Sequence, residues 1–210
     1  MRNKKVDKNM LFVILYGIAK ILETILFNIK IENPSNLPKE GRVILCPNHT
    51  SNIDPVVLMI NTKRTIHFLA KEELFKGKFL TWVFTQLFVI PVKRNENDAS
   101  AVKKCLKVLR GERVLGIFPE GTTIKNGKEL IAPKAGALML ALQTKSPIVP
   151  IAIYGKYKFR GKITIRLGQP IYFDAYYSQK YKTNELIEIT QNTVMQKIQM
   201  MLEDIKGANH

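Results

Sequence analysis

Short apolar stretches alternate with amphipathic stretches along most of this chain, and that alternation constrains the fold more than any other feature. The apolar stretches predict strands, and the amphipathic stretches of helical period predict helices. The expected strands cover residues 42–46, 66–70, 88–92, 113–118, 148–154 and 163–167. The expected helices cover residues 54–62, 78–87, 135–143 and 183–205, with one more ending at residue 109 after a turn at 95–98. This order predicts an α/β fold, in which one domain holds a mixed β-sheet flanked by helices.

The N-terminal segment differs from the rest because residues 10–29 are almost entirely apolar. As a helix they would span about 30 Å, which is close to the thickness of a bilayer core. Polar residues interrupt the segment at helical spacing, namely Lys20, Glu23, Thr24 and Asn28. A polar stripe beside a broad apolar face predicts an amphipathic helix lying in the membrane interface. A spanning helix, a signal peptide and a helix packed on the domain's own core are the alternatives.

This segment suggests a division of the chain into two parts. Residues 1–33 would form a basic N-terminus and the membrane-associating helix, and residues 34–210 the α/β domain. Pro34, Pro38 and Gly41 would mark a linker between the helix and the first strand. The basic residues at the start would add attraction to anionic lipid.

The formal net charge of +16 predicts attraction to polyanions, which include nucleic acid, anionic lipid and acidic proteins. Residues 130–173 contain no acidic residue at all. Recognised nucleic-acid-binding motifs are absent from the sequence, and aromatic residues are not interleaved with basic ones, so nucleic acid is not the expected partner. The two cysteines, Cys46 and Cys105, have no metal-binding spacing and fit buried thiols in a reducing compartment.

His49 and Asp54 lie five residues apart, directly after an apolar stretch. Histidine is the natural base for removing a proton from a hydroxyl, and a carboxylate on its other nitrogen fixes the tautomer. A simpler interpretation makes Asp54 an N-cap, with Pro55 as the first helical residue. Cys46 is a candidate thiol nucleophile, although core packing suits it better. A hydrolase is a further alternative, and a metal site is not expected because the chain has only three histidines.

A second cluster, Phe118-Pro119-Glu120-Gly121-Thr122, follows another apolar stretch. It combines a carboxylate, a flexible backbone and a hydroxyl at the expected end of a strand, where active sites of α/β proteins gather. A plain surface turn is the competing interpretation, because Pro and Gly are ordinary turn residues.

Together, residues 48–54 and 118–122 closely resemble two motifs of the glycerolipid acyltransferase family. That family carries His-x-x-x-x-Asp followed some seventy residues later by Phe-Pro-Glu-Gly-Thr. Further segments of the chain fit the same family in the same order, namely residues 68–74, 90–94, 134–137 and 148–153. The resemblance covers about residues 40–170 and implies the family's α/β fold.

The resemblance implies a reaction and roles for particular residues. His49 would activate an acceptor hydroxyl and Asp54 would orient it, without a covalent acyl-enzyme. Residues 120–122 would line the acceptor site, with Arg94 as the phosphate ligand and Lys71 as a second candidate. Where the family commonly continues with Arg-Ser, this chain has Thr123-Ile124. Either Arg94 with Lys71 or Lys125 then suffices, or the acceptor differs from the usual one.

The family also implies the partners. The acceptor would be a lysophospholipid, with 1-acyl-glycerol-3-phosphate giving phosphatidic acid as the leading choice, and another lysolipid or glycerol-3-phosphate as alternatives. The donor would be acyl-CoA or acyl-ACP (acyl carrier protein), and no other cofactor is expected. The reaction would take place on the cytoplasmic face of an anionic membrane. A non-enzymatic basic module that binds lipid or nucleic acid is the alternative from a different class.

Overall fold

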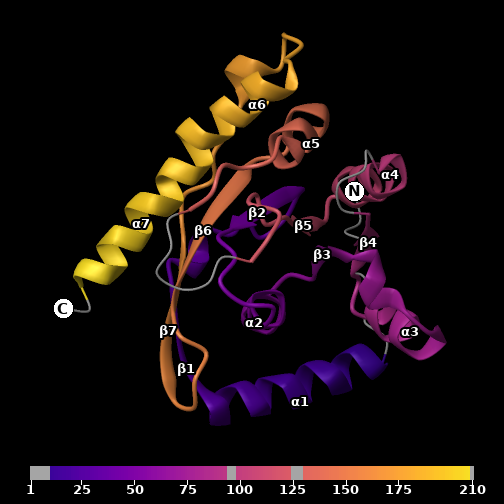
Figure 1. The fold of residues 1–210 in the computed structure, drawn as a ribbon, viewed down its shortest axis with the longest axis vertical. Coiled ribbons are helices and arrows are strands. Elements are labelled where there is room, and N and C mark those ends of the chain that lie inside the picture. The colour runs from indigo at the N-terminus through magenta and orange to yellow at the C-terminus, as the bar shows by residue number, and fades with distance from the viewer. Residues whose placement is uncertain (1–9, 94–97, 124–129, 209–210) are drawn as a thin grey trace.

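A computed structural model of the chain describes residues 10–93, 98–123 and 130–208. Its centre is a seven-stranded sheet with the order β1-β7-β6-β2-β5-β3-β4 (Figure 1). The strands are β1 (Phe27–Glu32), β2 (Val43–Pro47), β3 (Ile66–Lys71), β4 (Ile90–Val92), β5 (Val114–Gly116), β6 (Ile148–Gly155) and β7 (Gly161–Leu167). The predicted α/β fold with a mixed sheet is confirmed.

The helices fall close to their expected positions. They are α1 (Met10–Leu26), α2 (Asp54–Asn61), α3 (Lys78–Gln86), α4 (Ala99–Arg110), α5 (Gly136–Thr144), α6 (Thr183–Thr190) and α7 (Gln196–Gly207). A π-helical turn, Gln191–Met195, joins α6 and α7. In the part of the chain that the structure describes, no helix is both long enough and apolar enough to cross a membrane.

The direction of the strands decides where the functional loops meet. β2 pairs in parallel with both β5 and β6, and β3 pairs in parallel with β5 and β4. The loops after β2, β3, β4 and β5 therefore all leave from the same edge of the sheet. β7 runs antiparallel to β6 and parallel to β1, which makes the sheet mixed.

Both faces of the sheet are covered, because successive residues of a strand point to opposite faces. Ile44 and Cys46 of β2 pack with the buried side chains of α4, α5, the π-helical turn and α7. Val43 and Leu45 pack with α2 on the other face. Every residue of β2 is buried, as expected for a central strand covered on both sides.

The expected end of the N-terminal helix, at residue 29, is wrong. The helix ends at Leu26, and the next residue begins β1, which pairs along its whole length with β7. Residues 28–32 alternate polar and apolar side chains, and this period of two favours a strand. Residues 33–42 thus connect two strands, and they are not a linker between the helix and the first strand. The expected division of the chain at residue 33 stays a prediction.

α1 is amphipathic, and Lys20 and Glu23 of its polar stripe face the protein, whereas Thr24 is exposed. Lys20 Nζ binds Glu23 Oε2 at 2.6 Å and Asn61 Oδ1 of α2 at 2.8 Å. Glu23 is buried and also accepts a hydrogen bond from Asn61. The outer side is apolar, and its exposed side chains, each at least half accessible, are Val13, Ile14, Ile18, Ile21, Leu22 and Ile25. The predicted amphipathic helix is therefore present, with its apolar face turned to the outside.

Candidate active site

The loop after β2 is fixed to the sheet by a buried amide. Asn48 donates from Nδ2 to the carbonyl of Ile153 at 3.0 Å, and its Oδ1 accepts from the Ile153 amide at 2.7 Å. This side chain imitates a strand pairing beyond the end of β2. It places the next residue, His49, at the edge of the sheet from which the loop after β5 also leaves.

His49 and Asp54 are in direct contact. His49 Nδ1 lies 3.0 Å from Asp54 Oδ2, and the two residues are 7% and 0% exposed. A carboxylate can only accept, so the Nδ1 proton lies on the imidazole and Nε2 is left as the basic nitrogen. The imidazole also stacks on Phe118, with ring centroids 3.9 Å apart. This is the geometry of a base and the residue that orients it.

The Asp54 carboxylate accepts several further hydrogen bonds. Its Oδ2 accepts from the amides of Thr50 and Ser51, both at 2.7 Å. Its Oδ1 accepts from Thr50 Oγ1 at 3.2 Å and from the hydroxyl of Tyr157 at 2.7 Å. The N-cap interpretation of Asp54 is wrong, because Asp54 is the first helical residue and Ile53 precedes it as the N-cap. The carboxylate binds backbone amides upstream of the helix, and it is held rigidly beside the imidazole.

Glu120 joins the same cluster from the loop after β5. Its Oε1 accepts from the backbone amide of His49 at 3.2 Å. Its Oε2 is buried and has no hydrogen-bond partner among the described residues. Burial raises the pKa of Glu120 to about 7, and the nearby charge of Asp54 acts in the same direction. Glu120 is thus a buried carboxyl, 2% exposed, with one oxygen that is not satisfied by the described residues.

The turn after Glu120 requires a glycine. Gly121 has φ +68°, and a Cβ atom there would lie 2.7 Å from Cε and 3.2 Å from Nζ of Lys134. Lys134 donates its backbone amide to the carbonyl of Pro119 at 2.8 Å, which holds it against this turn. Lys134 is not among the site residues predicted from the sequence, because its approach to Gly121 depends on how the loop folds. Thr122 is exposed at the same turn.

Of the two expected phosphate ligands, only Lys71 lies within the described residues. Lys71 is the last residue of β3, is exposed, and pairs in register with Val92 of β4. It lies at the edge of the sheet that carries His49, but none of the hydrogen bonds or ion pairs described here links it to His49, Asp54 or Glu120. Arg94 lies outside the described residues, as do Ile124 and Lys125. The hydroxyl of Thr123 lies 3.4 Å from Oδ1 of Asn52.

Cys46 does not belong to this site. It is completely buried in the core, and burial raises the pKa of its thiol far above the ordinary range. A thiol in such surroundings is unreactive. The site therefore offers a base without a neighbouring thiol nucleophile.

Comparisons with known proteins show the family of this chain. Residues 28–154 match the model of the Acyltransferase family, which is more than half of the chain. This chain belongs to the acyltransferase family. The predictions of the family and of an O-acyltransferase are confirmed, and the non-enzymatic alternative is set aside.

The relatives of this chain include bacterial acyltransferases whose names specify the acceptor. A 1-acyl-sn-glycerol-3-phosphate acyltransferase from Bacillus subtilis is 30% identical over 159 residues, covering 73% of this chain and 78% of the relative. A protein of the same name from Borreliella burgdorferi is 30% identical over 173 residues, which cover 78% of this chain and 69% of that relative. The crystal structure of the 1-acyl-sn-glycerophosphate (LPA) acyltransferase PlsC from Thermotoga maritima superposes with a TM-score of 0.71 at 24% identity, covering 96% of this chain and 83% of that one. This structure shows that the two proteins share a fold.

Proposed function

We propose that this acyltransferase moves a fatty acyl group from a thioester to the free hydroxyl of a lysophospholipid, with 1-acyl-glycerol-3-phosphate as the acceptor and phosphatidic acid as the product. The observation that carries the proposal is the buried contact between His49 and Asp54, with Glu120 bonded to the His49 backbone. The names of the relatives support this choice of acceptor.

The chemistry follows from the two nitrogens of His49. Nδ1 donates to Asp54, so Nε2 takes the proton from the acceptor hydroxyl as its oxygen attacks the thioester carbonyl carbon. The tetrahedral intermediate then collapses and the C–S bond breaks. The leaving thiolate takes the proton back from the imidazolium, which the Asp54 carboxylate stabilises in the meantime. No acyl group becomes attached to the protein in this scheme.

The acceptor's phosphate requires cations near the loop of residues 120–122. Lys134 lies across Gly121 and forms no ion pair among the described residues, which makes it a candidate in place of the arginine missing at residue 123. Arg94 and Lys71 remain candidates, and Lys71 lies at the same edge of the sheet. Thr122, exposed at the turn of Gly121, offers a hydroxyl.

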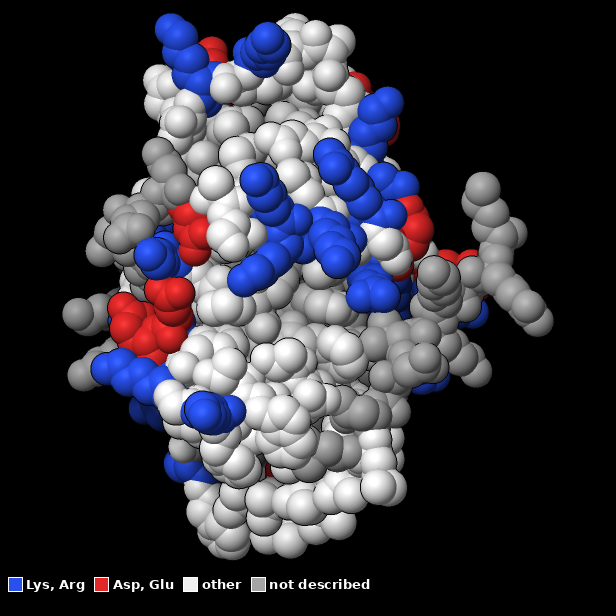
Figure 2. Space-filling view, turned by 90° about the vertical axis from the view of Figure 1, so that its right-hand side faces the viewer, with Lys and Arg blue, Asp and Glu red and all other residues white. Residues whose placement is uncertain are grey.

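The donor is anionic whether it is acyl-CoA or acyl carrier protein, and basic surface suits both. Figure 2 shows Lys and Arg side chains gathered at the height of α4. This helix exposes four cations, which are Lys103, Lys104, Lys107 and Arg110. Below them the same face is largely uncharged, at the height of α3 and α1.

We place the reaction at the cytoplasmic face of an anionic membrane, with α1 lying in the interface. Its outer side is apolar and its polar side is bonded to α2, so the helix can face lipid without leaving the domain. Replacing both Ile18 and Ile21 by Glu should release the protein from anionic vesicles in a flotation assay. Replacing Lys197 of α7 by Glu is the control for added negative charge. Equal vesicle binding by the Ile18/Ile21 variant and the unchanged protein would contradict this role.

The function itself is tested by incubating membranes that carry the protein with labelled acyl-CoA or acyl-ACP and a panel of acceptors. The panel contains 1-acyl-glycerol-3-phosphate, other lysophospholipids and glycerol-3-phosphate. We expect labelled phosphatidic acid as the main product. Labelling of a different acceptor would correct the substrate, and the absence of label in every acceptor would refute the proposal.

A further inference from the structure

Tyr157 makes the shorter of the two side-chain hydrogen bonds to Asp54 Oδ1. Its hydroxyl lies 2.7 Å from that oxygen, whereas Thr50 Oγ1 lies 3.2 Å away. Tyr157 comes from the turn between β6 and β7, more than a hundred residues along the chain from Asp54. The motifs that carry the family resemblance do not include it.

We propose that Tyr157 is a positioning residue for the His49–Asp54 pair. By binding Oδ1, its hydroxyl fixes the rotation of the carboxylate so that Oδ2 faces His49 Nδ1. This hydrogen bond also draws part of the negative charge of the Asp54 carboxylate away from the imidazole. The kinetic consequence rests on the proposed function, whereas the effect on the imidazole does not.

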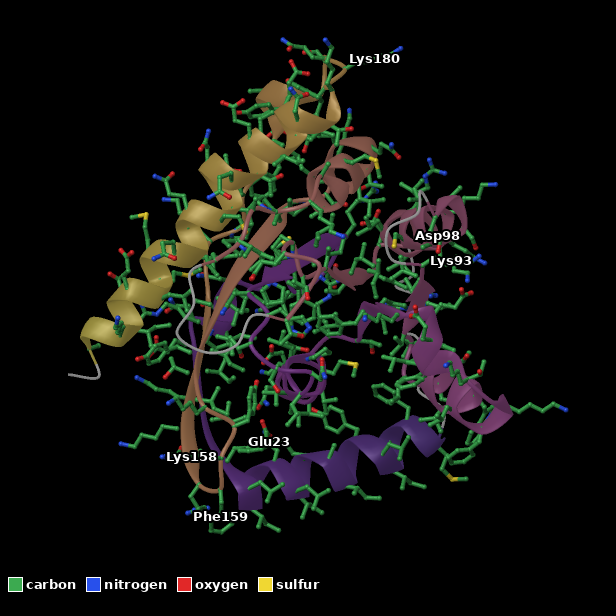
Figure 3. The ribbon with its side chains drawn as sticks, viewed as in Figure 1. Glu23, Lys93, Asp98, Lys158, Phe159 and Lys180 are labelled. Carbon is green, nitrogen blue, oxygen red and sulfur yellow. The ribbon has the colours of Figure 1, made fainter. Side chains whose placement is uncertain are left out.

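The turn that carries Tyr157 is built to aim it inward. Gly155 has φ +128°, and a Cβ atom there would lie only 2.3 Å from the carbonyl oxygen of Lys162. Only glycine fits that backbone, so the chain can bend two residues before Tyr157. Beyond it, Lys158 and Phe159 lie at the tip of the turn beside the end of α1 (Figure 3), and Phe159 is 72% exposed.

The junction between α1 and β1 supports Tyr157 from the other side. The ring of Phe27 meets the ring of Tyr157 edge-on, with centroids 5.4 Å apart. The amide of Arg160 donates to the carbonyl of Leu26, the last residue of α1, at 2.6 Å. The hydroxyl is therefore held between α1, β1 and the sheet.

The charged groups around the His49–Asp54 pair keep the Tyr157 hydroxyl protonated. Glu120 faces His49 from the loop after β5, and Glu23 of α1 acts on Tyr157 from the other side. Burial, Asp54 and Glu23 all raise the pKa of Tyr157, so its hydroxyl stays protonated and donates to the carboxylate. Without this donor, the Asp54 carboxylate loses one of the hydrogen bonds that hold it beside His49.

The test compares Tyr157→Phe with Tyr154→Phe, a matched change in the adjoining strand. Among the described residues, the Tyr154 hydroxyl makes no hydrogen bond. NMR of the imidazole, with the signals assigned from a His49→Ala sample, should show that Tyr157→Phe shifts the Nδ1 proton signal of His49, because the carboxylate that accepts this proton is no longer fixed in rotation. Tyr157→Phe should also lower kcat about tenfold with little change in KM. Thr50→Val, which removes the longer bond, should have a smaller effect.

The outcomes separate this inference from the proposed function. If the unchanged protein transfers no acyl group, the proposed function fails, but the NMR signal of the His49 imidazole still decides the role of Tyr157. If Tyr157→Phe lowers only the melting temperature and leaves both the His49 signal and kcat unchanged, Tyr157 is merely structural and the inference is overturned. A similar shift in Tyr154→Phe would overturn it as well.

Discussion

Two histidines of this fold, His49 and His67, are buried in different surroundings. His49 follows β2 and is bonded through Nδ1 to the carboxylate of Asp54. His67 lies within β3, and its Nδ1 is 3.3 Å from the backbone carbonyl of Val114. The two residues are 7% and 5% exposed, so burial does not distinguish them.

The difference lies in the partner of each imidazole. Burial lowers the pKa of His67 to about 4, and a neutral carbonyl does not offset that effect. His67 therefore stays neutral and packs beside Phe88 as a core residue. His49 instead has a carboxylate partner that fixes the orientation of its ring. The partner, and not burial, therefore distinguishes the proposed base from the core histidine.

Apart from the loss of His49 itself, Asp54→Asn should give the largest effect, and it would make the surroundings of His49 more like those of His67. An amide cannot hold the imidazole in the same tautomer with the same charge, so kcat should fall about a hundredfold. Acyl transfer to 1-acyl-glycerol-3-phosphate measures the change, with circular dichroism as the check on folding. A loss of less than about threefold would break the comparison.

His67→Ala should affect stability instead of activity. The removed side chain leaves a cavity beside Phe88, which should lower the free energy of unfolding by about 3 kcal/mol. The folded protein should keep its kcat within about twofold, because His67 has no contact with the reacting groups. Urea unfolding and acyl-transfer assays measure the two quantities. A hundredfold loss of kcat in folded His67→Ala would show that the wrong histidine has been chosen.

Glu120→Gln should change how stability depends on pH. The pKa of Glu120 is about 7 when folded and 4.5 in its ordinary environment, so between these values only the folded state holds the proton. Stability from this group is therefore lost as the pH rises through 7, by about 2 kcal/mol after allowing for relaxation. Glu120→Gln should melt higher than the unchanged protein at pH 8 and similarly at pH 5.

His67 provides the opposite case in the same pH range. Its folded pKa of about 4 lies below the ordinary 6.5, so its contribution is lost as the pH falls from 6.5 to 4. Comparing Glu120→Gln with His67→Ala by thermal melting at several pH values separates the two groups. A melting difference that stays constant from pH 5 to pH 8 in Glu120→Gln would contradict the raised pKa.

Lys134→Ala should give the smallest effect and tests whether a cation near His49 binds the substrate. Its ammonium lies at the turn of Gly121, so the KM for 1-acyl-glycerol-3-phosphate should rise about tenfold while kcat changes little. Lys197→Ala, an exposed lysine of α7, should leave both unchanged. Equal KM values for the two variants would remove Lys134 from the acceptor site.

The sequence alone predicts most of the helices and strands, because each apolar stretch has the period of its element. It also selects His49, Asp54 and Glu120, whose contacts arise from loops that leave one edge of the sheet. β1 was not predicted, because its alternating residues directly follow the apolar helix. No Gly or Pro marks the boundary between the helix and the strand.

Contacts across the fold could not be predicted in the same way. Nothing next to Tyr157 or Lys134 in the sequence shows that they approach Asp54 and Gly121, because those distances depend on the β6–β7 turn and on the packing of loops. The helical spacing of its polar residues predicted the polar stripe of α1. Nothing in the sequence predicted that this stripe would bind Asn61 of α2. Periodicity shows which side of a helix is polar, and packing decides what that side contacts.

The most direct test of the account measures acyl transfer by His49→Ala and His67→Ala at equal concentrations of folded protein. Both are changes of a buried histidine to alanine, so each controls for the other. We expect His67→Ala to form labelled phosphatidic acid at close to the rate of the unchanged protein, and His49→Ala to be slower by about a hundredfold or more. Near-full transfer by His49→Ala would contradict the assignment of the base.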